Sequence, residues 1–198
     1  MVKTSRGERL KKLVFILAVV FIGPLSLLYK LLDLIHPSDQ LFSSFAQLLS
    51  LIPGKVGNYL RLGFHSFVLE RCDTDCVISF LVQFSQRNTE IQSGVYIGPQ
   101  SNIGSCIIKK NTLLGSGVHV MSGKSQHNFD DLDIPIKDQG GKFTQIEVGE
   151  NCWIGNGSMI MANIGNHSII GAGSVVTEDI PPYSIAAGNP ARVLKTRQ

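Results

Sequence analysis

VGENCWIGNGSMIMANIGNHSIIGAGSVV, residues 148–176, is the stretch that decides the fold of this chain. An aliphatic residue recurs every six positions, and after one segment two residues short the same spacing resumes. The aliphatic positions are Val148, Ile154, Ile160, Ile164, Ile170 and Val176. A period of six fits neither an α-helix nor a simple alternating strand. Self-similarity at this fixed period predicts a solenoid of the parallel β-helix type.

The same spacing occurs earlier, at Ile91, Ile97 and Ile103, and again from Ile108 to Val120 after a slip of one residue. A small or sulfur-bearing residue stands four positions after the aliphatic one at Cys152, Ser158, Ser168 and Ser174. We interpret each unit as a short strand plus a corner. The aliphatic and small residues point inward, and Gly or Asn takes the corner conformation that a Cβ would penalise. Stacked coils then share one continuous core.

Three segments also carry a resemblance to a known family: WIG at 153–155, IGAGSVVT at 170–177 and AAGNPARV at 186–193. Over about residues 76–197 the chain resembles the hexapeptide-repeat acyltransferases, in particular the maltose, galactoside and capsule- or colanic-acid-type O-acetyltransferases. The resemblance implies an all-β, left-handed parallel β-helix with three hexapeptides per coil. It also implies a homotrimer whose active sites lie between subunits. The handedness rests on the resemblance alone, because parallel crossovers in general are right-handed.

Composition limits the function classes. The formal net charge is +3 and only 17% of the 198 residues are charged, which argues against a nucleic-acid-binding protein. The four cysteines, at 72, 76, 106 and 152, lack the spacing of a zinc site, so we expect reduced packing residues and no metal. Such residues suit a reducing, cytoplasmic compartment.

The N-terminal region, residues 1–70, reads as helical. Five basic residues and one acidic residue within positions 1–12 precede an uncharged run from Leu13 to Tyr29 that contains Gly23-Pro24. Positive residues keep the N-terminus in the cytoplasm, so a single crossing would export the repeat domain away from a cytosolic acyl-CoA donor. We therefore favour peripheral or monotopic attachment to the cytoplasmic face of the inner membrane, by a dip that returns at Gly-Pro or by an interfacial helix. A buried core or oligomer-contact helix is the alternative.

Two amphipathic helices should follow the apolar run. The first is capped by Ser38 or Asp39 and stopped by Pro53-Gly54, and the second covers 56–69, with His65 on its surface. Membrane contact through residues 13–69 and packing on protein both remain open for them. We place the boundary of the β-helix domain, 71–198, near 71–76.

A polar excursion, residues 121–147, interrupts the repeat, and binding and catalysis concentrate in such loops. Transfer of an acyl group to a sugar hydroxyl needs a base with a pKa near neutrality, for which histidine is best suited. His127 lies in the loop where the resembling enzymes carry their catalytic histidine, about two residues later than in the galactoside and maltose enzymes. His119 is the second choice, as a structural or substrate-contacting residue, and His167 should be a solvated corner residue.

The resemblance also implies the binding residues. Acceptor contacts would come from Ser85 and Asn88 in the early coils. From the loop sequence itself, Asp130 or Asp131 could orient His127, orient the acceptor or only solvate the loop. The acetyl-CoA donor would contact a tryptophan beside the groove, pantetheine-facing residues on the coils and a basic pair at the end. These positions are Trp153, Asn156, Ala172, Thr177, Arg192 and Lys195. Glu178 departs from the family, where Lys is common.

The sequence therefore predicts an acetyl-CoA-dependent O-acetyltransferase acting on a sugar in polysaccharide or lipid-linked saccharide biosynthesis. Three alternatives stay open. They are a non-catalytic trimeric scaffold, an N-acetyltransferase of an amino sugar, and a metalloenzyme such as a γ-type carbonic anhydrase. The last would require three histidines that converge on zinc.

Overall fold

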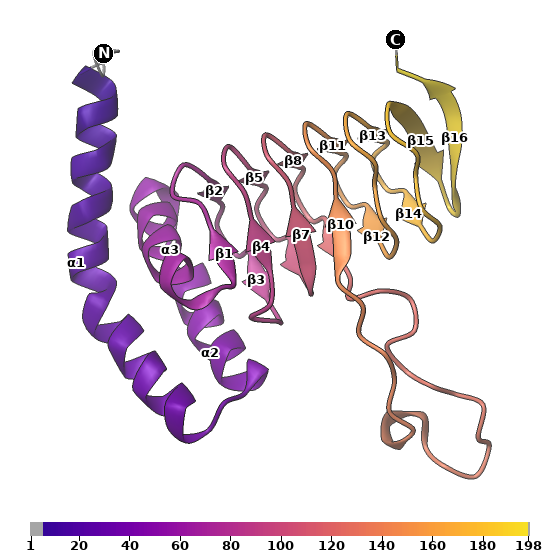
Figure 1. Ribbon diagram of the computed structural model, residues 1–198, viewed down its shortest axis with the longest axis horizontal. Coiled ribbons are helices and arrows are strands. Elements are labelled where there is room, and N and C mark those ends of the chain that lie inside the picture. Colours follow the sequence, from indigo (N-terminus) through magenta and orange to yellow (C-terminus); the bar gives the residue numbers. More distant parts are fainter. Residues whose placement is uncertain (1–5, 198) are drawn as a thin grey trace.

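The computed structural model describes residues 6–197, without the side chains of residues 6, 8 and 9, so part of the basic flank lies outside the described residues. It forms a left-handed parallel β-helix of about six coils, capped at one end by three helices (Figure 1). The predicted solenoid is confirmed.

Three parallel sheets make the walls of the solenoid. The first sheet contains β1 (Arg71–Cys72), β4 (Glu90–Ile91), β7 (Cys106–Ile108) and β10 (Ile146–Val148). The second contains β2 (Val77–Ile78), β5 (Tyr96–Ile97), β8 (Leu113–Leu114), β11 (Trp153–Ile154), β13 (Ile169–Ile170), β15 (Ser184–Gly188) and the antiparallel β16 (Ala191–Thr196). The third contains β3 (Gln83–Phe84), β6 (Asn102–Ile103), β9 (His119–Val120), β12 (Met159–Ile160) and β14 (Val175–Val176). Single bridges at Ile164 and Ile180 continue the first sheet.

The aliphatic repeat fills the interior. Leu114, Ile154 and Ile170 are register partners on successive strands of the second sheet, and all three are buried. The small residue four positions after each aliphatic residue also points inward. At two of these positions, Thr112 Oγ1 donates to Gly149 O at 2.6 Å and Ser158 Oγ donates to Gly171 O at 3.0 Å, and each hydrogen bond reaches the next coil. A short hydroxyl side chain thus satisfies a buried carbonyl that an aliphatic residue would leave without a partner.

Gly and Asn take the corner conformation as expected, and the glycine directly after the aliphatic residue has a second purpose. Corner residues with positive φ do occur, for example Asn151 (53°) and Gly157 (67°). Gly155, however, is required by space, because a Cβ there would lie 2.4 Å from the backbone nitrogen of Ala172 on the next coil. The close approach of neighbouring coils, not the local backbone angle, selects this glycine.

The helical cap consists of α1 (Arg6–Ile35), α2 (Asp39–Ser50) and α3 (Gly54–Val68). Ser38 caps α2 by accepting a hydrogen bond from Leu41 N at 3.1 Å. Helix α1 is continuous through Pro24, so the chain does not turn back at Gly23-Pro24 as one of the expected membrane arrangements required. Its segment Leu10–Ile35 is long and apolar enough to cross a membrane by length and composition, with a mean hydropathy of 2.2.

Arg61 of α3 is fully buried and joins the cap to the solenoid. Its Nε donates to Ile78 O at 2.9 Å, and its Nη1 donates to Leu49 O at 3.1 Å and Ile52 O at 2.7 Å. Burial lowers the pKa of Arg61 to about 10, so the guanidinium is still charged at neutral pH.

His65 is not on the helix surface, so that expectation was wrong. Its side chain is fully buried, and its ring centroid lies 4.5 Å from that of Phe84 in the first coil and 5.4 Å from that of Phe64. The β-helix covers the face of α3 that the isolated sequence leaves ambiguous. Burial, with a smaller effect of the Arg61 charge, lowers the pKa of His65 to about 3.

We predict that Arg61→Met lowers the free energy of unfolding by about 3 kcal/mol or more, because three carbonyl groups at the junction lose a charged donor. Urea denaturation followed by circular dichroism measures this loss. Arg71→Met, at an exposed arginine paired with Asp73, serves as the control and should cost far less. Equal losses in the two variants would contradict the junction role.

We also predict that His65 makes the fold acid-sensitive. Its pKa is lower in the folded than in the unfolded chain, so the unfolded chain binds more protons and stability falls as the pH drops below about 6.5. Between pH 7 and pH 5 the wild type should lose roughly 2 kcal/mol more than His65→Leu. Urea midpoints at the two pH values test this. Phe64→Leu, a buried neighbour without a titratable group, should keep the wild-type pH dependence.

Candidate active site

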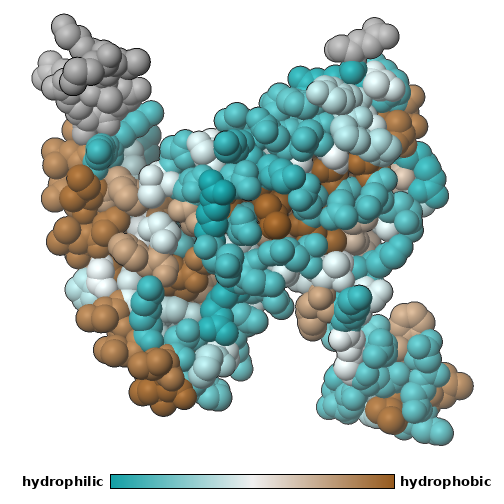
Figure 2. Space-filling view, viewed as in Figure 1, coloured by the Kyte–Doolittle hydropathy of each residue, from teal (hydrophilic) through white to brown (hydrophobic). Residues whose placement is uncertain are grey.

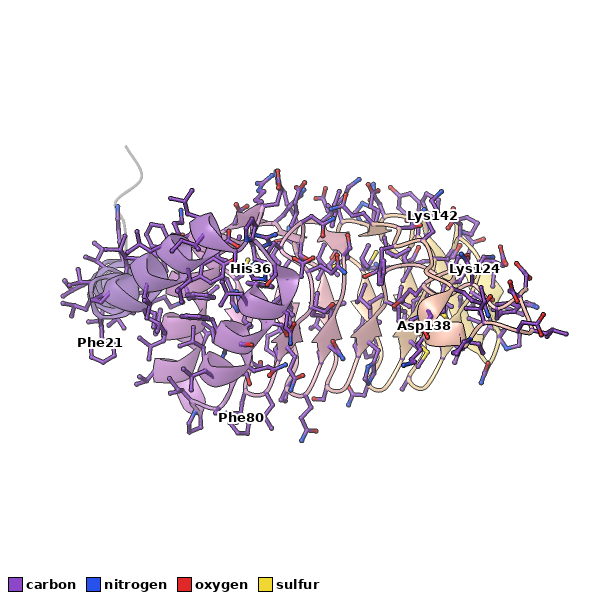
Figure 3. The ribbon with its side chains drawn as sticks, turned by 90° about the horizontal axis from the view of Figure 1, so that it is seen from below. Phe21, His36, Phe80, Lys124, Asp138 and Lys142 are labelled. Atoms are coloured by element: carbon purple, nitrogen blue, oxygen red, sulfur yellow. The ribbon has the colours of Figure 1, made fainter. Side chains whose placement is uncertain are left out.

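The excursion loop leaves the solenoid after β9 and returns at β10, at the corner between the third and first sheets (Figure 1). Besides one 3-10 turn, Ile136–Asp138, it has no regular secondary structure. Viewed from below, the part of the loop marked by Lys124, Asp138 and Lys142 overlies the C-terminal coils, far from Phe21 of α1 (Figure 3).

His127 is exposed on this loop, and its neighbours are held by the returning arm. Lys142 N donates to Ser125 O at 2.7 Å, and Asn128 N donates to Gly140 O at 2.9 Å. Gly141 makes this pairing possible, because a Cβ there would lie 1.9 Å from Gln126 O and 2.8 Å from His127 N. The backbone around His127 is therefore fixed from both sides while its imidazole stays open to solvent.

The two loop aspartates are not positioned alike. Asp131 Oδ1 accepts hydrogen bonds from Asp133 N at 2.9 Å and Ile134 N at 3.3 Å, and Asp131 O accepts one from Gln139 Nε2 at 2.6 Å. This carboxylate folds the loop tip. Asp130 is exposed and makes no side-chain hydrogen bond within the described part of the chain. Neither carboxylate is hydrogen-bonded to His127 among residues 6–197, so within one chain neither orients it.

His119 lies on the outer face of the third sheet, on the coil from which the loop departs. It is exposed, and its register partners are Asn102 on one side and Met159 on the other. His167 lies at another corner of the solenoid and is only partly exposed. Its ring stacks on Tyr183 with centroids 4.9 Å apart, and its Nδ1 is 3.1 Å from Asn151 Nδ2. The three histidines therefore lie on the loop, on the third sheet and at a corner, and among the described residues they form no group that could hold a metal ion.

The residues expected to bind the donor fall into groups. Trp153, 54% exposed, shares a row on the outer face of the second sheet with Ile169, Ile185 and Lys195, which are successive register partners. Asn156 and Ala172 lie on successive coils at the adjacent corner, where Asn156 Oδ1 accepts a hydrogen bond from Ser116 N at 3.1 Å. Arg192 on β16 pairs with Ala187 of β15. The row from Trp153 to Lys195 and this corner form one continuous surface at the C-terminal end.

Thr177 lies on the other side of the third sheet, next to Glu178. Lys124 from the base of the excursion loop meets both, with its Nζ 2.8 Å from Glu178 Oε1 and 3.4 Å from Thr177 O. A cation thus stands beside Glu178, the position at which the sequence departs from the pattern expected from the resemblance. Sequence reasoning missed Lys124, because it lies 54 residues from Glu178 and no local pattern links the two.

Ser85 and Asn88 lie in the first coil, near the helical cap. Asn88 lines a cavity of about 750 Å³ between α1, the start of α2, the end of α3 and this coil. The end of the excursion loop reaches the same place, because Gln145 Nε2 donates to Asn88 O at 2.5 Å. Arg87 in the cavity wall pairs with Asp33 of α1 at 2.6 Å and Asp39 of α2 at 3.2 Å.

Residues 145–178 match the family described as bacterial transferase hexapeptide (six repeats). The match covers coils in the C-terminal half of the solenoid. Over 74 residues it is 42% identical to a probable acetyltransferase of Mycobacterium tuberculosis, a match covering 36% of this chain and a quarter (25%) of that relative.

Two solved structures show the same fold. A maltose O-acetyltransferase from Clostridium difficile 630 has a TM-score of 0.61 at 24% identity, covering 79% of this chain and 85% of that one. An N-acyltransferase from Bacillus cereus, in complex with an amino-deoxyglucose nucleotide and coenzyme A, has a TM-score of 0.52 at 19% identity, covering 62% and 70%. The β-helix fold that the resemblance implied is thereby confirmed.

We predict that Gly141→Ala displaces the His127 segment and leaves the solenoid intact, because the new Cβ collides only with the loop backbone at Gln126 and His127. The side-chain NMR signals of His127 should shift, while the thermal unfolding temperature stays close to that of the wild type. Lys142→Ala, the neighbouring change that keeps the backbone pairing, is the control and should leave the His127 signals in place. Unchanged signals in Gly141→Ala would show that the loop is not held at this contact.

Proposed function

We propose that this protein is an acyl-CoA-dependent O-acetyltransferase that transfers an acetyl group from acetyl-CoA to a hydroxyl group of a saccharide. The observation that carries the proposal is that one solenoid, matched in part by a transferase hexapeptide family, has both a solvent-exposed imidazole, His127, and the row from Trp153 to Lys195. The maltose O-acetyltransferase and the coenzyme A complex, which share the fold, support the class of reaction.

In this mechanism His127 acts as general base. Its neutral imidazole accepts the proton of the acceptor hydroxyl while that oxygen attacks the thioester carbonyl. The tetrahedral intermediate places negative charge on the former carbonyl oxygen, and a backbone N–H of the site stabilises it. Collapse breaks the carbon–sulfur bond, and the imidazolium returns the proton to the leaving thiolate. The products are the O-acetyl ester and free coenzyme A.

The donor would lie along the row on the second sheet. Trp153 flanks the acyl and pantetheine end, with Asn156 and Ala172 at the neighbouring corner. Lys195 is three strands from Trp153, about 14 Å at the usual spacing of paired strands. Together with Arg192 it supplies positive charge for the phosphates. Thr177 lies across the third sheet from this row, so we assign it to the pantetheine arm of a donor bound between two copies, with Lys124 as an additional cation beside it.

We propose a homotrimer, because one chain does not bring the two halves of this site together. The loop with His127 leaves the corner between the third and first sheets, whereas Trp153 faces outward from the second sheet. The loop carries exposed apolar residues, and the outer face of the second sheet offers exposed apolar partners. On the loop these are Phe129, Leu132, Ile134, Ile136 and Phe143, and on the sheet Val77, Tyr96, Leu113 and Trp153. The loop of one copy and the row of the next would complete each site.

The acceptor is proposed to be a neutral saccharide, held on the side of the cavity near Asn88 with Ser85, His119, Asp130 and Asp131 as further contacts. The cavity contains Lys30 and Arg87 against three carboxylates, Asp33, Asp39 and Glu70, a formal balance of −1. This balance disfavours a phosphate group, while its amides and carboxylates are suited to sugar hydroxyl groups. A polysaccharide or lipid-linked intermediate fits the cytoplasmic face of the inner membrane, where we place the protein.

The proposal is tested by thiol release from acetyl-CoA in the presence of a panel of sugars, amino sugars and lipid-linked sugars. His127→Ala should lower turnover by about a hundredfold or more and leave coenzyme A binding unchanged, because only the base is removed. His167→Ala, at a corner histidine that the proposal does not use, should retain most turnover and serves as the histidine control. Turnover that survives His127→Ala but not His119→Ala would move the base to His119. Acetylation of amines alone would favour the N-acetyltransferase, and no coenzyme A binding would leave the scaffold.

The shared site has its own test. An inactive His127→Ala chain mixed and refolded with an inactive Trp153→Ala chain should regain part of the wild-type activity, because some mixed sites receive both native halves. No recovery in a mixed trimer that is shown by mass to have formed would contradict a site between subunits.

A further inference from the structure

Helix α1 exposes an apolar surface that the rest of the chain leaves uncovered. Thirteen of its large apolar side chains are exposed, from 36% for Val14 to 82% for Leu34, and they surround a narrow buried stripe that includes Ala18, Ile22 and Tyr29. A helix that is apolar on all sides is normally covered by protein or by lipid. Figure 2 shows this surface as a continuous apolar band along the outer side of the helical cap.

The band extends onto α2. An apolar groove of about 660 Å³ runs between α1 and the end of α2, so that Phe21 and Leu28 of α1 and Leu48 and Leu51 border the same depression. Leu48 and Leu51 are themselves 57% and 62% exposed. The uncovered surface is therefore wider than one helix and belongs to the cap as a whole.

Helix α1 cannot leave the cap to cross a membrane without breaking contacts. Ile22 lies against Gly63 of α3, where an added Cβ would be only 3.0 Å from its side chain. Tyr29 packs edge-on against Phe64, with ring centroids 5.6 Å apart, and Asp33 pairs with Arg87 of the first coil. Phe15 already packs on the core, so the free apolar part, from Leu10 to Val14, spans only about 8 Å, against a hydrocarbon core of about 30 Å. A crossing by the packed part would carry the Asp33–Arg87 pair into hydrocarbon, at a high cost in free energy.

Basic residues accompany the apolar band. Lys11 and Lys12 lie at its N-terminal end, Lys30 lies near its C-terminal end, and Lys55 starts α3; all four are exposed. Lysines beside an exposed apolar helix face are typical of a helix lying in the interface of an anionic membrane. A protein partner would need no such border of positive charge, which is why we favour lipid over a second copy of the chain.

We propose that α1 lies in the plane of an anionic lipid bilayer, inserts the apolar band α1–Leu48–Leu51 into one leaflet, and holds the solenoid upright on the membrane. In Figure 1, α1 runs across the end of the β-helix, roughly perpendicular to the row of coils. If α1 lies parallel to the membrane, the axis of the solenoid therefore points away from the membrane surface. The base of the excursion loop, three coils from this end, stands roughly 25 Å above the surface if one helix layer is added to the coil spacing.

Vesicle binding by the full-length purified protein tests the proposal without reference to acyl transfer. Vesicles of phosphatidylcholine with about 30% phosphatidylglycerol should float the protein, and pure phosphatidylcholine should bind about tenfold less. Leu17→Glu/Leu31→Glu, at side chains that are 60% and 53% exposed, should abolish flotation with the fold intact by circular dichroism. Leu194→Glu, at a leucine that is 65% exposed on β16 at the opposite end of the solenoid, is the matched control and should float like the wild type. A double variant that still floats would overturn the proposal.

Depth measurement distinguishes an in-plane helix from a crossing one. Environment-sensitive labels on Phe21→Cys and Leu31→Cys should both be quenched best by lipids with a nitroxide near the headgroup, because both positions lie at the same shallow level. Strong quenching of the label at position 21 by a nitroxide deep in the acyl chain would show a crossing helix and contradict the proposal. Absence of vesicle binding, together with dissociation of an oligomer in Leu17→Glu/Leu31→Glu, would assign the band to a second copy instead.

Discussion

The close spacing of successive coils is the constraint on which the rest of the structure depends. At Gly155 the next coil is so near that a Cβ would meet its backbone at 2.4 Å, and inside the coil Thr112 and Ser158 reach the neighbouring carbonyl groups. Parallel strands at this distance bond every coil to the next, and the aliphatic stack excludes water from the interior. The same spacing gives the solenoid a regular repeat in which every residue has a fixed position. A residue's place in the six-residue unit fixes its face, and its coil number fixes its height.

A stack of coils needs an end, because the last coil exposes both its core and its unpaired strand edges. At the C-terminal end, β16 folds back antiparallel to β15. At the other end, α3 lies on the first coil and Arg61 donates to carbonyl groups of both the coil and α2. The buried guanidinium of Arg61 donates to three carbonyl groups and so fixes how the cap sits on the first coil. His65 is buried at the same junction. The three helices cover the core of the first coil, but the outer face of α1 is itself apolar and exposed.

The proposed chemistry depends on two parts of the molecule, the regular solenoid and the irregular excursion loop. The solenoid presents Trp153 and Lys195 in one row, whereas the excursion loop carries His127 away from the wall, held by backbone pairing at Gly141. Lys124, at the base of the loop, pairs with Glu178 on the solenoid wall two coils further along. Because the row and the loop leave the solenoid on different faces, association of copies is the natural way for them to meet.

The sequence by itself determined the solenoid, its core positions such as Ile154, the interruption that carries His127 and the helical character of residues 6–68. These features are local, since a period of six and a break in it can be read within one or two repeats, and only the handedness needed a resemblance. The tertiary structure decided that His65 is buried, that Asp131 folds the loop tip, that Lys124 meets Glu178 and that α1 runs across the end of the coils. Each of these depends on contacts between residues far apart in the chain, and an amphipathic helix or a charged side chain is compatible with several such partners until the coils are stacked.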